Sequence, residues 1–198
     1  MSYTEIGQLT ALSGGVISLN SGHSIVGQPG SIVAPGNVIQ TQYVRVDTRP
    51  TYYCYNNASA NNQMYTAVRA LNLPFRPMYA NSMVLVKFVI NGEMTHDTVW
   101  SIMKDEQMIT RAQGEAFPNR WNGMAFQNYD RDDSSTPSQT SIMWMDIPGT
   151  TDMVTYSPGF RRSNGNDVTF YLNRCVSSSG QDSYEATVSF GVAMEIAQ

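Results

Sequence analysis

Three side chains that could exchange protons, Glu93, His96 and Asp97, lie close together in the sequence. Carboxyl and imidazole groups in such proximity are the ones that general acid–base catalysis uses. They follow the dipeptide Asn91-Gly92, which predicts the tip of a β-hairpin because both turn residues must adopt positive φ. The end of a hairpin is normally polar and solvated, so we expect a solvated turn here and no catalytic residue.

Other patterns typical of catalysis or metal binding are absent from the sequence. A nucleophile elbow needs G-x-S-x-G, and GHSIVG (22–27) has one residue too many. The two histidines, His23 and His96, cannot form a zinc set with ligand spacing. DRDDS (130–134) alternates oxygen ligands as a calcium loop does, but it lacks the turn glycine and the distal glutamate. We therefore expect a protein that is not an enzyme and that has no metal or cofactor site.

Several aromatic residues could form a surface that binds glycans, since aromatic faces stack on sugars and asparagines bond to sugar hydroxyls. They are Tyr52, Tyr53, Tyr55, Trp121 and Tyr129. The alternative is that these side chains belong to the core or to an interface, as most aromatic residues of β-sandwiches do.

The composition predicts a hydrated surface of polar side chains with few charges. Only 14% of the 198 residues are charged, against about 25% in typical soluble domains. Such a surface suits either a protein that packs against copies of itself or a larger assembly, or a secreted β domain. The net charge of −4 argues against nucleic-acid binding, which requires a basic patch.

The cysteines and the apolar segments bear on where the protein is made. Cys54 and Cys175 have no spacing that predicts a disulfide, so we expect free thiols in a reducing compartment. The first ten residues lack the basic and apolar regions of a signal peptide. No apolar run reaches the roughly 18 residues that a membrane helix needs. We expect a protein that is made in the cytoplasm and has no membrane partner.

The sequence divides into two regions of different character. Residues 1–37 hold seven glycines, no lysine or arginine, and only short apolar pairs, so they predict an extended arm that cannot fold alone. Residues 38–198 hold about nine to eleven short stretches with strand patterns and no amphipathic helix. This pattern predicts an all-β domain, specifically an antiparallel, jelly-roll-like β-sandwich with a glycine-rich N-terminal arm. The hairpin at Asn91-Gly92 would join a strand at 82–90 to a return strand at 98–104.

Some of the expected strands are apolar on both faces, which a sandwich exposed to water does not need. In 82–94, Val84, Val86, Phe88 and Ile90 oppose Met83, Leu85 and Val89. In 167–174, Val168, Phe170 and Leu172 oppose Tyr171, and in 188–196, Val188, Phe190, Val192 and Met194 are set against Ala193 and Ile196. We expect identical subunits to cover the second face, with an interface formed by Leu85, Val89, Tyr171 and Ile196. The alternative is that the arm or a long loop covers it.

The order of motifs in the chain resembles a known module. The motifs are PGNVIQ (35–40), residues 71–93, MITRAQGEA (108–116), residues 141–162, DVTFYLNR (167–174) and residues 184–197. Together they resemble the β-sandwich module of virion proteins of tailed bacteriophages, especially phages of cyanobacteria, which occurs in small capsid decoration proteins and at the ends of fibres. The resemblance spans about residues 35–198. Fibre proteins carry a long shaft before the module, whereas this chain has about 35 residues there.

The resemblance implies a trimeric jelly roll without catalytic activity. We expect a capsid decoration (cement) protein of the virion, assembled in the host cytoplasm, with the major capsid protein as its partner. Its arm would anchor it to the capsid through Ile17, Leu19, Ile25, Val26, Ile32 and Val33. The alternative is a short tail-fibre tip that recognises host surface glycans through the loops at 114–123 and 130–139.

Overall fold

The computed structural model describes residues 21, 34–55, 65–113, 122–127, 135–162, 167–177 and 185–198. Within these residues the chain forms strands β1 to β12 and two short 3-10 helices, and it has no α-helix. The prediction of an all-β protein is therefore confirmed. The predicted arm lies almost entirely outside the described residues, and those from Ala34 onward belong to one unit.

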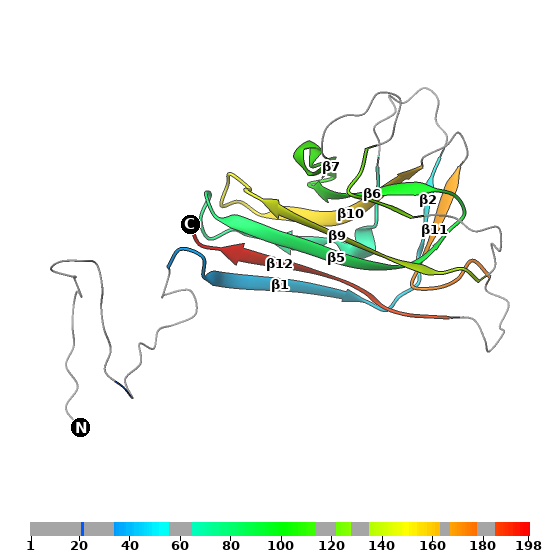
Figure 1. Ribbon diagram of the computed structural model, residues 1–198, viewed down its shortest axis with the longest axis horizontal. Helices are drawn as coiled ribbons and strands as arrows, with labels where there is room; N and C mark the ends of the chain where they lie inside the picture. The colour runs from blue at the N-terminus through cyan, green and yellow to red at the C-terminus, as the bar shows by residue number, and fades with distance from the viewer. Residues whose placement is uncertain are drawn as a thin grey trace. The chain divides into compact units, whose positions relative to one another are not determined.

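Six strands form the first sheet, in which all neighbours pair antiparallel. In order they are β1 (Val38–Val46), β12 (Ser189–Ile196), β5 (Met83–Met94), β11 (Val168–Leu172) and β2 (Thr51–Cys54), while β9 (Ser138–Asp146) pairs with β5 along its other side. The long strands β1, β12, β5 and β9 run side by side (Figure 1). Within the described part of the chain, β1 and β9 are the edges of this four-stranded region.

The second sheet also has six strands, four of which have only two or three residues. Its main path is β3 (Thr66–Ala67), β10 (Val154–Arg162), β6 (Thr98–Lys104) and β7 (Gln107–Met108). The remaining two are β4 (Leu73–Phe75), paired with β10, and β8 (Ala125–Gln127), paired with β6. The 3-10 helices η1 (Arg69–Leu71) and η2 (Thr110–Gln113) lie between strands of this sheet.

The core lies between the two sheets and is built from alternate residues of their strands. On β5 the predicted core face is confirmed, since Val84, Val86, Phe88 and Ile90 are all buried. Three aromatic rings join the layers: Trp100 and Phe160 of the second sheet pack on Phe170 of the first, with ring centroids 5.1 to 5.7 Å apart. Offset and edge-on contacts of this kind add about 0.5–1.5 kcal/mol each beyond the burial of area.

The predicted hairpin at Asn91-Gly92 is wrong. Both residues lie inside β5, where Gly92 pairs with Leu172 of β11 on one side and Ser138 of β9 on the other. A Cβ at Gly92 would collide with the carbonyl oxygen of Tyr171 and the ring of Phe170. The glycine is therefore needed for the close approach of β11. The strand at 98–104 forms as expected, but as β6 it pairs in the second sheet.

Both cysteines are buried and unpaired, as predicted for Cys54 and Cys175. The chain ends of the described unit meet beside β1 and β12. There, Gly36 N–H donates to the carbonyl of Ala197 at 2.8 Å, and Ala197 N–H donates to the carbonyl of Asn37 at 2.9 Å. These bonds extend the pairing of β1 with β12 to the last residues of the chain.

Candidate functional site

Strand β12 presents its large side chains to the outer face of the first sheet. Its residues alternate strictly: Ser189, Gly191, Ala193 and Glu195 are buried, whereas Phe190, Val192, Met194 and Ile196 are partly exposed. This arrangement corrects two expectations, because Ile196 shares a face with Met194 and because the bulky face points away from the core. A strand that packs only on its own core would have the opposite arrangement.

The neighbouring strands continue this apolar surface, which we call the outer face. The register places Tyr43, Val192, Lys87 and Met143 in one row across β1, β12, β5 and β9. The adjacent row holds Thr41, Met194, Leu85 and Met145. Tyr43 and Met143, at the two edges, are 59% and 57% exposed. The outer face is thus four strands wide and apolar, with Lys87 as its one charge in these two rows.

The predicted interface residues fall in two places. Leu85, Val89 and Ile196 all lie on the outer face, where Leu85 is opposite Met194 and Val89 is opposite Phe190. Val89 is buried there, while Leu85 and Ile196 are partly exposed. Tyr171 lies apart on β11, under the guanidinium of Arg174, which sits 4.5 Å from the ring centroid. Contact of these residues with another subunit stays a prediction.

A buried carboxylate holds β12 against the loop before β5. Glu195 accepts hydrogen bonds from the N–H groups of Met78 (2.9 Å) and Tyr79 (3.0 Å) and from the side-chain amide of Gln40. Burial by itself would raise the pKa of Glu195, but these hydrogen bonds outweigh it and hold the pKa below its ordinary value. The charged carboxylate is therefore a structural clamp that fixes the position of the outer face.

Glu93, the first residue of the candidate acid–base group, makes structural hydrogen bonds. Glu93 is buried, and its Oε1 accepts bonds from the N–H and the hydroxyl of Thr136, at 3.1 and 2.8 Å. Its Oε2 accepts the N–H of Val176 at 2.7 Å. The two oxygens of Glu93 thus connect β5 to Thr136, which precedes β9, and to Val176, which follows β11. His96 and Asp97 follow in the connection from β5 to β6, where Asp97 is exposed.

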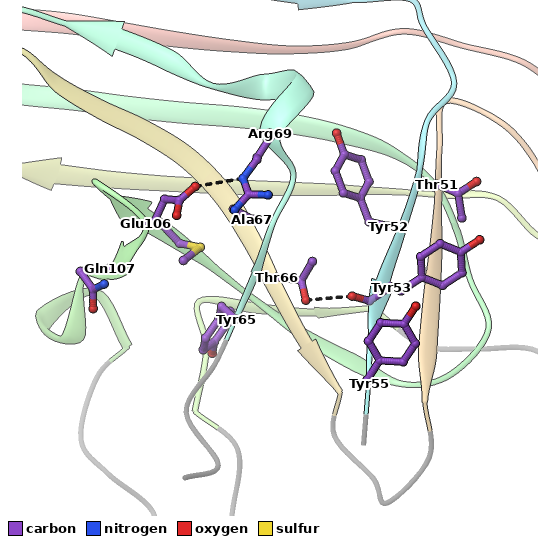
Figure 2. A pocket seen from close by; sticks show the side chains of 11 residues that line it. Thr51, Tyr52, Tyr53, Tyr55, Tyr65, Thr66, Ala67, Arg69, Glu106 and Gln107 are labelled. Atoms are coloured by element: carbon purple, nitrogen blue, oxygen red, sulfur yellow. Dashed lines mark hydrogen bonds and ion pairs between the residues drawn. The ribbon is translucent and has the colours of Figure 1, made fainter. Parts of the chain in front are cut away.

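A cleft of about 540 Å³ opens where the edge strand β2 of the first sheet meets the second sheet (Figure 2). A hydrogen bond joins the two sheets there, since the hydroxyl of Thr66 on β3 donates to the carbonyl of Tyr53 on β2 at 3.2 Å. The cleft is lined by Thr51, Tyr52, Tyr53, Tyr55, Tyr65, Thr66, Ala67, Arg69, Met103, Glu106 and Gln107. We call it the tyrosine cleft.

Four tyrosines line this cleft, and each is held differently. The rings of Tyr53 and Tyr55 stack 5.9 Å apart at an interplanar angle of 14°, and they are 53% and 67% exposed. The hydroxyl of Tyr52 accepts the N–H of Ala70 at 2.9 Å, which anchors its partly buried ring to η1. Burial raises the pKa of Tyr52. Tyr65 is buried, and its hydroxyl donates to the carbonyl of Asn122 at 2.5 Å.

An ion pair forms the polar wall of the cleft, at the end away from the exposed tyrosines Tyr53 and Tyr55, with Thr66 between the two ends (Figure 2). The Nε of Arg69 lies 2.9 Å from the Oε1 of Glu106, and the hydrogen bond from this guanidinium to the carboxylate raises the pKa of Arg69. Glu106 belongs to a two-residue turn, Asp105-Glu106, between β6 and β7. Both residues have positive φ, at 50° and 61°, which is the geometry of a type I′ turn.

The sequence identified part of this cleft and missed the rest. Tyr52, Tyr53 and Tyr55 were predicted candidates for glycan contact, and the structure places all three in it. Trp121, Tyr129 and most of the two predicted contact loops lie outside the described residues. The sequence did not predict Tyr65, Arg69 and Glu106, because they come from three other segments and only the fold brings them into the same cleft as β2. Within the described residues, the sequence spacing carried no signal for them.

Among the described residues, no group of three or more His, Cys, Asp or Glu side chains is placed to hold a metal ion. The described part of the chain also contains no helix of the length and hydropathy that crossing a membrane requires. The calcium-like segment 130–134 and the arm residues lie outside the described ranges. No protein-family model matches this chain, and no curated protein matches it in sequence.

Proposed function

We propose that the protein is a structural protein of a bacteriophage virion, in which copies of the chain associate through the outer face. The form that best fits the resemblance of residues 35–198 is a trimeric jelly roll that decorates the capsid. The observation that carries the proposal is the inverted strand β12, with Phe190, Val192, Met194 and Ile196 outward and small or polar residues inward.

Burial of the outer face would supply the driving force for association. Each Å² of apolar surface removed from water contributes about 25 cal/mol, and this face is rich in Met, Val and Ile side chains. Four strands spaced by about 4.8 Å and about seven residues long give a footprint of roughly 14 by 23 Å. A standard interface buries about 800 Å² on each partner. The outer face is therefore the apolar centre of the proposed interface, and other segments must add to it.

The N-terminal arm is the proposed source of further contacts, with the capsid as partner. Its apolar residues Ile17, Leu19, Ile25, Val26, Ile32 and Val33 would bind small pockets on the major capsid protein, and three arms on one trimer would bind more tightly than one. A chain without residues 1–33 should then lose most of its affinity for undecorated capsids. Full-strength binding by the truncated trimer would contradict this role of the arm.

The oligomeric state tests the proposal directly. Light scattering of the purified full chain should give the mass of three chains over a range of concentrations. Met143→Glu places a charge on the outer face and should shift the mass toward a single chain. Met153→Glu is the matched control, because Met153 is similarly exposed (51% against 57%) but lies in the turn after β9. A wild-type mass of one chain at high concentration would refute the proposal.

A second candidate function is recognition of host surface glycans by a short tail-fibre tip. The specific observation that favours it is the tyrosine cleft, with two exposed stacked rings at one end and a polar wall at the other. Adsorption of the purified protein to host cells discriminates the two candidates, because a capsid decoration protein should not adsorb.

A further inference from the structure

Two tyrosine rings of the cleft are exposed in a way that their own fold does not use. Tyr53 lies on the edge strand β2 and Tyr55 directly follows that strand, and their stacked rings place both side chains on the same side of the chain. Their rings stack on each other but remain more than half exposed. No hydrogen bond within the described residues engages either phenol hydroxyl. The pair therefore presents apolar ring surface and hydroxyl groups together to a ligand.

The polar wall supplies hydrogen-bonding groups of both kinds. Arg69 offers guanidinium donors, and Glu106 offers carboxylate acceptors, with their contact at 2.9 Å. Gln107 adds an amide with both functions at the start of β7. The planar guanidinium and the carboxylate can each bind two neighbouring groups of a ligand at once. A molecule with adjacent hydroxyl groups matches this wall, because each hydroxyl both donates and accepts.

The turn that carries Glu106 has a conformation that its residues disfavour. L-residues other than Gly, Asn and Asp rarely adopt positive φ, yet Glu106 has φ of 61°. The turn is nevertheless well fixed, since Asp105 exchanges hydrogen bonds with Thr155: its N–H donates to the carbonyl at 2.9 Å, and its Oδ1 accepts the N–H at 2.8 Å. Strained residues that the surroundings hold in place are concentrated at binding sites. Here the held group is the carboxylate of the polar wall.

The charge of the cleft selects among ligands that stack on aromatic rings. The lining has one cation and one anion, Arg69 and Glu106, which pair with each other. A single-stranded nucleic acid would need a positive groove, and the chain has a net charge of −4. A proline-rich peptide also binds aromatic grooves, but its prolines lack N–H donors and would leave the Glu106 carboxylate facing acceptors.

We propose that the tyrosine cleft is a binding site for a neutral oligosaccharide, with one sugar ring stacked on Tyr53 and Tyr55 and the hydroxyl groups of other sugar units along the cleft bonded to Arg69, Glu106 and Gln107. Saccharide binding would be the recognition step of the second candidate function, and the biological role of the cleft rests on that function. Saccharide binding does not depend on the proposed oligomer, because Tyr53, Tyr55, Arg69, Glu106 and Gln107 are not among the residues of the outer face. Strand β2 and the stacking of the two rings hold Tyr53 in place before a ligand binds, which reduces the ordering cost of binding.

Saturation-transfer NMR and titration calorimetry with defined oligosaccharides test the site. The probes are neutral oligomers of β-linked glucose, α-linked glucose, mannose and N-acetylglucosamine, with decaproline and oligothymidine as competing ligand classes. At least one oligosaccharide should bind the full-length protein with a Kd of about 1 mM or tighter. Tyr53→Ala and Tyr55→Ala should each weaken that binding about fivefold or more. Glu106→Gln changes an exposed side chain, so it tests the polar wall without endangering the fold.

Two control variants separate stacking from general effects. Tyr53→Phe keeps the ring and should retain most of the affinity, whereas Tyr43→Ala removes an equally exposed tyrosine from the outer face and should leave binding unchanged. Absence of binding by every oligosaccharide at about 10 mM would overturn the proposal. So would binding that survives Tyr53→Ala, Tyr55→Ala and Glu106→Gln, or binding of decaproline or oligothymidine in place of sugars. Light scattering on the same samples reports separately on the proposed oligomer.

Discussion

The ring of Phe88 on β5 lies against the backbone of Gly191 on β12, in the space that a side chain at position 191 would occupy. The two residues are opposite each other in the antiparallel register. The aromatic ring fills the core at this point, so β12 has no room for a side chain on its inner side at position 191. The large side chains of β12 are left on the outer face. One core contact thus contributes to the apolar surface on which the proposed assembly depends.

Gly191→Ala should destabilise the fold. Its Cβ would overlap the Phe88 ring and also approach Val44 on β1, so either the ring or the strand must move. Overpacking of this kind costs about 1–3 kcal/mol of the free energy of unfolding, which urea denaturation measures. Phe88→Leu removes part of the clash, so the double variant should lose less stability than the sum of the two single variants. Strict additivity would show that Phe88 does not exclude a side chain at 191.

Glu195→Gln should change how stability depends on pH. The pKa of Glu195 in the folded protein is held below the ordinary value of 4.5, so the unfolded chain binds protons more readily. The stabilisation by the carboxylate is complete well above pH 4.5 and is lost as the pH falls through the lowered folded pKa. At pH 7 the variant should be less stable by about 1–3 kcal/mol. Urea denaturation should show this gap closing toward about pH 3, and a gap that stays constant with pH would be evidence against the clamp.

Much of the sheet content was readable from local pattern. Alternation of apolar residues marked β5 and its core face, because Val84, Val86 and Phe88 recur with the period of a strand. The strand at 98–104 was predicted with the bounds of β6. These elements follow from burial of one face, which each segment encodes by itself.

Pairing partners and faces were harder to predict, because they depend on distant segments. Asn91-Gly92 is a strong hairpin signal, but Ser138 and Leu172 complete the sheet on both sides of Gly92, and these long-range ladders prevail over the local turn preference. The orientation of β12 depends on Phe88, about a hundred residues earlier in the chain. The tyrosine cleft likewise joins Tyr53 to Arg69 and Glu106, whose proximity only the packing of two sheets creates.

Tyr156→Phe should reveal a buried hydroxyl–carboxylate contact between the sheets. The hydroxyl of Tyr156 on β10 donates to Oδ2 of Asp146 on β9 at 2.8 Å, and Lys104 Nζ lies 3.0 Å from the same oxygen. Removal of the hydroxyl should cost about 1–3 kcal/mol at pH 7. Burial and then the bond to Asp146 raise the pKa of Tyr156 far above 10. The stabilisation is therefore present below pH 10 and is lost as the unfolded tyrosine ionises above it.

The difference in unfolding free energy between wild type and Tyr156→Phe should accordingly shrink between about pH 9 and pH 11. Urea denaturation at these two pH values measures it. A difference that does not change with pH would mean that Tyr156 ionises equally easily in the folded and unfolded chain. That result would contradict a stabilising hydrogen bond from Tyr156 to Asp146.

Glu106→Gly and Glu106→Ala form a matched pair that separates backbone strain from side-chain function. Both variants remove the carboxylate and its ion pair with Arg69, so the comparison isolates the positive φ at position 106. Glycine adopts this conformation freely, whereas a Cβ costs about 1–2 kcal/mol, offset in part by the greater chain entropy of unfolded glycine. Glu106→Gly should thus be about 1 kcal/mol more stable than Glu106→Ala in urea denaturation. If the carboxylate contacts sugar hydroxyls, both variants should lose saccharide affinity equally. A stabilised Glu106→Gly protein that still bound saccharide as the wild type does would show that the strained turn serves no ligand.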